Sequence, residues 1–107
     1  MLYMGLLHYG GSNDGIPIED RALAHLKVAI ATKLRRNESF TLSWRDPDNG
    51  EHGRQTIWLH PSIPLRFDFD DPETPSLNVK WIEQLMMSAN SSGGITLTDE
   101  VLELPEA

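Results

Sequence analysis

The sequence predicts an α+β fold of two layers, in which two helices cover one face of a mostly antiparallel sheet. Two stretches carry apolar residues at helical spacing, and several short stretches alternate apolar and polar residues as strands do. Short runs of turn residues connect successive strands, as they do in β-hairpins. The expected element order is β-β-α-β-β-β-α-β. With 107 residues the chain is long enough for a single core, so residues 1–100 should form one domain.

The chain is expected to begin with a β-hairpin. Residues 2–9 are mostly apolar and predict a strand, and residues 16–18 predict a short second one. Between them lie Gly, Asn and Asp residues, which tolerate the left-handed backbone angles of a turn. Pro17 has no amide hydrogen to donate to a neighbouring strand, so the second strand should lie at a sheet edge.

The first helix is expected over residues 21–36, with Asp20 as its N-cap and Asn37 at its end. Basic residues in its last turn suit the negative end of the helix dipole. The apolar stripe that should face the core consists of Leu23, Leu26, Ile30 and Leu34.

Three strands should follow, at residues 39–44, 55–59 and 65–69. A turn at residues 46–50 joins the first two strands into a second hairpin. Trp44 and Trp58 lie on these two strands, and we expect them to form a cross-strand pair. Pro61 and Pro64 make a corner before the third strand, because proline restricts both its own backbone and that of the residue before it.

A second helix should begin at Ser76 or Asn78, since either side chain can cap a helix. Its end is expected at the glycine pair at residues 93–94. A short strand at residues 95–98 and an acidic tail at residues 101–107 complete the chain. The apolar stripe of this helix consists of Ile82, Leu85, Met86 and Ala89.

Charge and composition narrow the classes of function. The net charge is −7, so the chain as a whole repels nucleic acid. There is no cysteine, which excludes disulfides, thiol nucleophiles and zinc–thiolate sites. No apolar run is long enough to span a membrane, and the N-terminus lacks the basic start of a signal peptide. A cytoplasmic location is therefore expected.

One basic cluster remains a candidate contact for an anionic partner. Lys33, Arg35 and Arg36 lie together in the last turn of the first predicted helix. Such a cluster can contact the phosphates of a nucleic acid. The alternative interpretation is a solvated helix end whose cations stabilise the helix dipole, and the acidic net charge favours it.

Two segments are candidates for catalysis or metal binding. His60 stands at the predicted corner, where it should end a strand and form hydrogen bonds at the bend. The acidic segment at residues 68–73 offers carboxylates that Mg²⁺ or Ca²⁺ could use, but its spacing matches no calcium loop. No serine elbow, zinc motif or phosphate-binding glycine loop is present. The sequence therefore predicts no catalytic residue, metal or cofactor.

A contact surface for protein is the leading functional expectation. Trp81, Met86 and Met87 lie on the second predicted helix, and aromatic and methionine side chains are enriched at interfaces. The alternative is that these side chains fill the core of a small domain. An exposed strand edge is the second expected contact element. The expected partner is another protein or a second copy of this chain.

Three segments together resemble a known family. They are LAHLKVAIATKLRRNESFTLSW at residues 23–44, TIWLHPSIPLRF at 56–67 and LNVKWIEQLMMSANSSGG at 77–94. They are similar to short actinobacterial proteins of unknown function that often carry the label ATP-dependent DNA ligase. The resemblance extends over nearly the whole chain and implies no catalytic or binding residues.

The ligase label can be compared with the chemistry of the sequence. Ligases of that class attack ATP with the lysine of a K-x-D-G motif. The lysines here stand in the contexts KVAI, KLRR and KWIE, none of which matches; they are Lys27, Lys33 and Lys80. We therefore expect a non-catalytic binding domain, with an accessory role beside nucleic-acid enzymes as the alternative.

Overall fold

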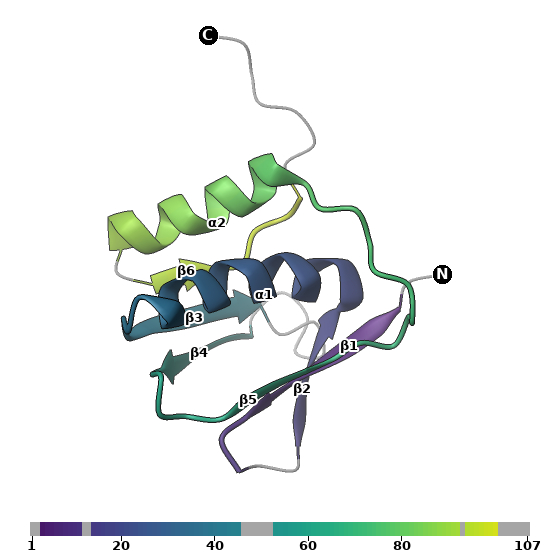
Figure 1. Cartoon of the computed structure of the whole chain (residues 1–107), viewed down its shortest axis with the longest axis horizontal. Helices are drawn as coiled ribbons and strands as arrows, with labels where there is room; N and C mark the ends of the chain where they lie inside the picture. The colour runs from purple at the N-terminus through teal and green to yellow at the C-terminus, as the bar shows by residue number, and fades with distance from the viewer. Residues whose placement is uncertain (1–2, 12–13, 46–52, 93, 101–107) are drawn as a thin grey trace, which may run out of the picture.

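The computed structural model describes residues 3–11, 14–45, 53–92 and 94–100, which form an α+β fold in the expected element order (Figure 1). The strands are β1 (Met4–Tyr9), β2 (Gly15–Glu19), β3 (Phe40–Arg45), β4 (Arg54–Leu59), β5 (Leu65–Asp68) and β6 (Gly94–Thr96). The helices are α1 (Asp20–Arg35) and α2 (Val79–Ser92). The predicted turn at 46–50 and the predicted tail at 101–107 lie outside the described residues.

The strands form two three-stranded sheets, where the sequence led us to expect one. The strand order is β2-β1-β5 in the first sheet and β4-β3-β6 in the second. All pairs are antiparallel except β3 with β6, which are parallel. After β4 the chain turns a corner at residues 60–64 and returns beside β1, so β5 joins the first sheet instead of extending the second (Figure 1).

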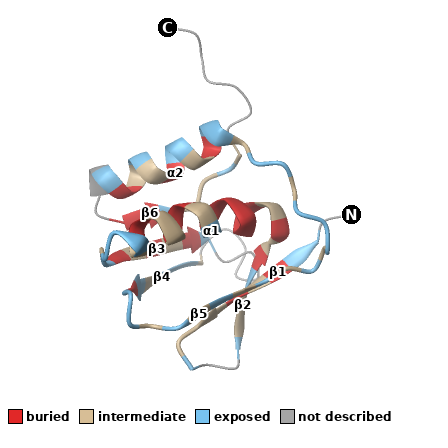
Figure 2. Ribbon diagram, in the orientation of Figure 1, coloured by how far each residue is buried: buried red, intermediate tan, exposed pale blue. Residues whose placement is uncertain are grey.

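The two helices and the two sheets enclose one hydrophobic core. Helix α1 packs against β1, β2 and α2, and α2 packs against β6. Figure 2 shows buried residues along α1 and on β3 and β6, in the middle of the molecule. The predicted stripe of α1 is buried apart from its last member, Leu34, which is partly exposed. The largest fully buried apolar side chains are Leu7, Leu23, Leu26, Ile30, Phe40, Leu42, Leu59, Leu85 and Ile95.

The first helix begins one residue earlier than predicted. Its N-cap is Glu19, whose side chain makes no capping hydrogen bond, so the prediction of Asp20 as the cap is wrong. Asp20 is instead the first helical residue and is buried, because its carboxylate accepts hydrogen bonds from the segment that follows β5. The predicted end at Asn37 is confirmed, since that residue adopts a left-handed φ of 62°.

The second helix is capped as the sequence predicts. The Oδ1 atom of Asn78 accepts the backbone N–H groups of Lys80, at 3.1 Å, and Trp81, at 3.3 Å. The prediction that Pro17 lies in an edge strand is also confirmed, because β2 is the outer strand of its sheet. No helix in the described part of the chain is long and apolar enough to span a membrane.

The predicted pairing of Trp44 with Trp58 is wrong. In the register of β3 and β4, Trp44 lies opposite Gln55, and Trp58 lies opposite Thr41. The two indoles point to opposite faces of the sheet, since Trp44 is 4% exposed and Trp58 is 53% exposed. The alternating strand pattern predicted the burial of Trp44, but the register could not be derived from a turn of uncertain length.

Candidate functional site

One glutamate pairs with two of the three cations of the predicted basic cluster. The Nζ atom of Lys33 lies 3.2 Å from Oε1 of Glu38, and Lys33 itself is buried. The Nη1 atom of Arg36 lies 4.0 Å from the other oxygen of Glu38. Only Arg35, among these three, is exposed and has no ion pair in the described structure. The chain reversal after α1 brings Glu38 back to the helix end, which helical periodicity does not reveal.

His60 stands at the corner after β4, as the sequence predicts, and it is exposed to solvent. Its Nδ1 atom accepts the backbone N–H of Ser62 at 3.0 Å and lies 2.8 Å from the hydroxyl of the same residue. The carboxylate of Asp68 lies near a different histidine, with its Oδ2 atom 3.7 Å from Nε2 of His8. Among the described residues, no three His, Cys, Asp or Glu side chains are placed to hold a metal ion.

The residues predicted to form an interface on α2 have different environments. Trp81 is 4% exposed and belongs to the core. Met86 is partly buried against the same core, whereas Met87 is 67% exposed. Val79, on the first turn of the helix, is exposed as well. The exposed part of this surface is therefore narrower than the sequence predicts.

The site that the structure forms most clearly is a groove between α1 and the loop at residues 69–77. Its volume is about 500 Å³, within the range of about 300–1,000 Å³ typical of ligand sites. Three segments line the groove: Tyr3 before β1, one side of α1 from its N-cap Glu19 to Val28, and the loop itself. No local motif could have predicted it, because these segments are distant in sequence.

The loop wall of the groove is fixed by hydrogen bonds to α1. The carboxylate of Asp20 accepts the backbone N–H groups of Asp70, at 3.1 Å, and Asp71, at 2.7 Å. Further along, Nη1 of Arg21 donates to the carbonyl oxygen of Ser76 at 3.0 Å. Within the loop, the Asp71 carboxylate accepts the N–H of Glu73 at 3.0 Å. Both ends of the loop are thus attached to the first turn of α1.

Apolar side chains line the groove and leave part of their surface exposed. Tyr3 is 45% exposed and Leu77 is 47% exposed, which is high for large apolar residues. Phe69 is partly buried against the core, and the Nζ atom of Lys27 lies 6.0 Å from its ring centroid. This lining offers contact area to an apolar side chain of a ligand.

The charges around the groove are mainly negative. Four acidic residues contribute to its lining: Glu19, Asp20, Asp71 and Glu73. Two cations also line it, Arg21, which is paired with Glu100, and Lys27, whose Nζ atom lies near the Phe69 ring, so the acidic residues outnumber the basic ones by two. The groove therefore presents carboxylates beside apolar surface, and it favours a cation over an anion.

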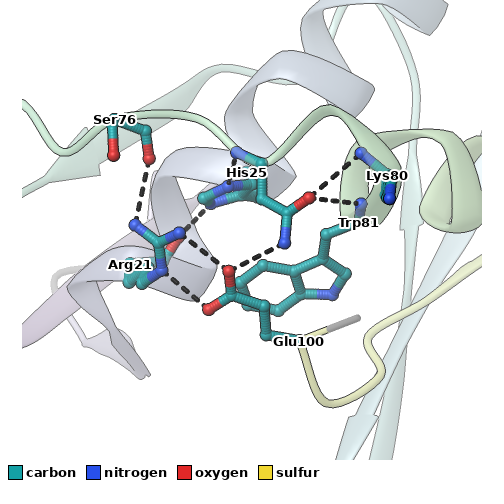
Figure 3. Close-up of polar contacts among 7 residues, drawn as sticks. Arg21, His25, Ser76, Lys80, Trp81 and Glu100 are labelled. Carbon is teal, nitrogen blue, oxygen red and sulfur yellow. Dashed lines mark hydrogen bonds and ion pairs between the residues drawn. The ribbon is translucent and has the colours of Figure 1, made fainter. Parts of the chain in front are cut away.

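Behind the groove, a polar network joins the two helices to the segment after β6 (Figure 3). Arg21 donates to both carboxylate oxygens of Glu100, from Nε and from Nη2, each at 2.7 Å. Asn78 donates from Nδ2 to Glu100 Oε2 at 2.9 Å. The two-pronged arginine–carboxylate geometry is the strong form of this contact. It holds the start of α2 against the start of α1.

His25 is fully buried in the same network. Its Nε2 atom lies 2.8 Å from the backbone nitrogen of Asn78, which can only donate, so Nε2 is an acceptor. The Nδ1 atom lies 2.7 Å from the carbonyl oxygen of Arg21 and therefore carries the proton. The ring packs against Trp81, with centroids 4.6 Å apart. The helical pattern places this histidine opposite the Leu stripe of α1, so it does not predict the burial, whose cause is the packing of residues from 78 onward.

The Arg21–Glu100 pair predicts a specific pH dependence of stability. The hydrogen bonds from Arg21, and next from Asn78, lower the pKa of Glu100 from its usual 4.5 to about 2. A lowered pKa in the folded state means that this carboxylate stabilises the fold above pH 4.5 and that the contribution is lost as pH falls toward 2.

Urea unfolding of the natural chain and of Glu100→Gln, measured across this pH range, tests the assignment. We expect a stability difference that is constant above pH 4.5 and shrinks toward pH 2. Because the other carboxylates titrate in both proteins, their effect cancels in the difference. A difference that does not change with pH would contradict the ion pair.

Comparison with known proteins shows which family the chain matches. A family model with the description "Domain of unknown function (DUF7882)" matches residues 4–100, which include every strand and helix of the fold. No curated protein and no solved structure matches the chain.

Proposed function

We propose that the chain, which belongs to the DUF7882 family of domains of unknown function, is a non-catalytic protein-binding domain. Its groove between α1 and the loop at residues 69–77 would take an extended segment of a partner protein that combines basic side chains with an apolar anchor. The observation that carries this proposal is the combination of exposed apolar surface and carboxylates in one groove with fixed walls.

The size and rigidity of the groove support a peptide ligand. A volume of about 500 Å³ accommodates a few side chains of an extended segment. The hydrogen bonds of Asp20 and Arg21 hold the loop in place, so little ordering of the loop has to accompany binding. Tyr3 and Leu77 offer the apolar contacts that anchor such segments.

Charge supports a partner other than a second copy of the chain. The chain carries a net charge of −7, so two copies repel one another, while a basic segment is attracted to the groove from a distance. Nucleic acid is the alternative partner, through Lys33, Arg35 and Arg36. Glu38 offsets that cluster, which makes it the weaker proposal. We also propose that the protein is located in the cytoplasm.

Calorimetric titration with designed peptides tests the groove. We expect a short blocked peptide of alternating leucine and lysine to bind, because it supplies both the apolar anchor and the cations. A peptide with glutamate in place of lysine should show no binding. Affinity for the lysine peptide should fall as salt rises from low concentration to about 0.1 M, where screening acts over about 10 Å.

Two pairs of matched variants locate the binding. Glu73→Lys in the groove and Glu83→Lys on α2 change the net charge equally, and only the former should weaken binding, by about tenfold or about 1.4 kcal/mol. Leu77→Ala in the groove should also weaken binding, whereas Met87→Ala, which removes a more exposed apolar side chain, should not.

Four results would overturn the proposal. The first is equal binding of the lysine and glutamate peptides. The second is a larger effect of Met87→Ala than of Leu77→Ala, which would favour the α2 surface expected from the sequence. The third is retention of duplex DNA or RNA at low salt without retention of the lysine peptide, which would favour nucleic acid. The fourth is a dimer mass in light scattering, which would identify a second copy as the partner.

A further inference from the structure

A second cavity adjoins the groove and has a different lining. Its volume is about 430 Å³. Residues from β1 and β2 line one part of it, and residues from the end of β3 and from the segment after β6 line the other. The buried residues of its lining are Ile18, Ala22, Trp44 and Trp81.

Two buried polar atoms of the cavity lining have no hydrogen-bond partner within the described part of the chain. They are the Nε1 atom of Trp81 and the Oγ1 atom of Thr98. Trp81 is 4% exposed, so its indole N–H cannot be satisfied by bulk solvent. Leaving a buried donor or hydroxyl unpaired costs roughly 1–3 kcal/mol, and buried polar groups in folded proteins usually have partners. Two such atoms at one cavity call for a group that supplies an acceptor.

The rest of the cavity lining indicates which kind of molecule would supply this acceptor. Trp44 and Trp81 provide two indole rings, and aromatic rings pack favourably against other aromatic rings. Three acidic residues and one basic residue line the cavity: Glu19, Asp99 and Glu100, with Arg45. Arg21 pairs with Glu100, and the remaining charges disfavour an anionic ligand. A volume of about 430 Å³ suits a molecule of one or two rings.

We propose that this cavity binds a small aromatic molecule without negative charge, whose hydrogen-bond acceptor pairs with the indole N–H of Trp81 and the hydroxyl of Thr98. Both atoms are covered by neighbouring side chains, so the ligand reaches them as those side chains reorient. Met4 lines the cavity, is 44% exposed and has a flexible side chain suited to such movement. The inference does not rest on the proposed groove function, because it is argued from Trp81 and Thr98, neither of which lines the groove.

Proton–nitrogen NMR spectra of the full chain test the inference with acetophenone as the probe. The chain has three tryptophans and therefore three indole N–H peaks, which Trp81→Phe and Trp58→Phe assign. We expect acetophenone, through its carbonyl oxygen, to move the Trp81 peak in a saturable way. The peak of Trp58, which lies on β4 and does not line the cavity, should not move.

Matched probes and variants separate this site from unspecific apolar binding. Ethylbenzene has the same ring without the carbonyl group and should bind at least about tenfold more weakly, because it leaves the donor unpaired. Thr98→Val should lower the affinity for acetophenone several-fold, because it removes the hydroxyl and leaves the contacts with the ring unchanged. Ala22→Leu should fill the cavity and abolish the saturable shift while the thermal midpoint is kept or raised.

Three outcomes would overturn the inference. One is the absence of a saturable Trp81 shift up to the solubility of acetophenone. Another is equal affinity for acetophenone and ethylbenzene, since the polar atoms would then take no part. The third is undiminished binding to Thr98→Val, a variant that keeps the test decisive if Ala22→Leu does not fold.

Discussion

Replacing His25 with alanine should lower the free energy of unfolding by about 3–5 kcal/mol. The ring is fully buried, so its removal leaves a cavity beside Trp81. The substitution also leaves the backbone N–H of Asn78 without its acceptor at the start of α2. Because small domains are stable by only about 5–15 kcal/mol, this loss is a large fraction of the total. Urea unfolding at neutral pH measures it directly.

Two further histidine variants show what the loss consists of. His25→Phe keeps most of the buried volume and removes only the hydrogen bonds, so it should cost about 1–3 kcal/mol. His60→Ala removes an exposed ring that bonds only within its own turn, and it should cost no more than about 1 kcal/mol. Equal effects of His25→Ala and His60→Ala would contradict the role given to the buried network.

Gly5→Val should destabilise the domain by about 3 kcal/mol or more, and Gly5→Ala by about 2 kcal/mol. A Cβ atom at this position would lie 2.7 Å from Oδ1 of Asp20, 2.7 Å from Cδ2 of Leu23 and 2.8 Å from the carbonyl oxygen of Asp68. All three separations are too short. The backbone oxygen and the core leucine cannot easily move, so the Asp20 carboxylate and the loop it binds must shift.

The Gly5 variants should therefore affect binding as well as stability. Displacement of Asp20 loosens the loop wall, and affinity for the leucine–lysine peptide should fall together with the unfolding free energy. Gly11→Ala is the matched control, because a Cβ atom there meets nothing within 4 Å, and it should change neither quantity by much. A Gly5→Ala protein as stable as the Gly11→Ala protein would show that the close approach is not required.

The local patterns of the sequence account for most individual elements of the fold. The apolar stripe of α1, the Asn78 cap of α2 and the alternation of β3 all predicted their structures correctly, because each depends on neighbours within a few residues. The division into two sheets and the parallel pairing of β6 with β3 depend on which distant strands meet. Alternation alone carries no information about that choice.

The candidate sites could be predicted far less well, for the same reason. The basic cluster and His60 were singled out by residue type, whereas the groove is built from segments far apart in the chain. One local feature did point to it. Gly5 interrupts an apolar strand, and a glycine at such a position often marks the close approach of another part of the chain. Here that part is Asp20, which fixes the groove wall.

The most direct test of the groove is the location of amide shift changes when the full chain is titrated with the leucine–lysine peptide. We predict that the changes concentrate on the two walls, at Lys27, Val28, Asp71, Glu73 and Leu77. The amides of His60 and Met87 should not change, because neither residue lines the groove. Changes centred on α2 around Met87, or on Lys33 to Arg36, would contradict the proposed function.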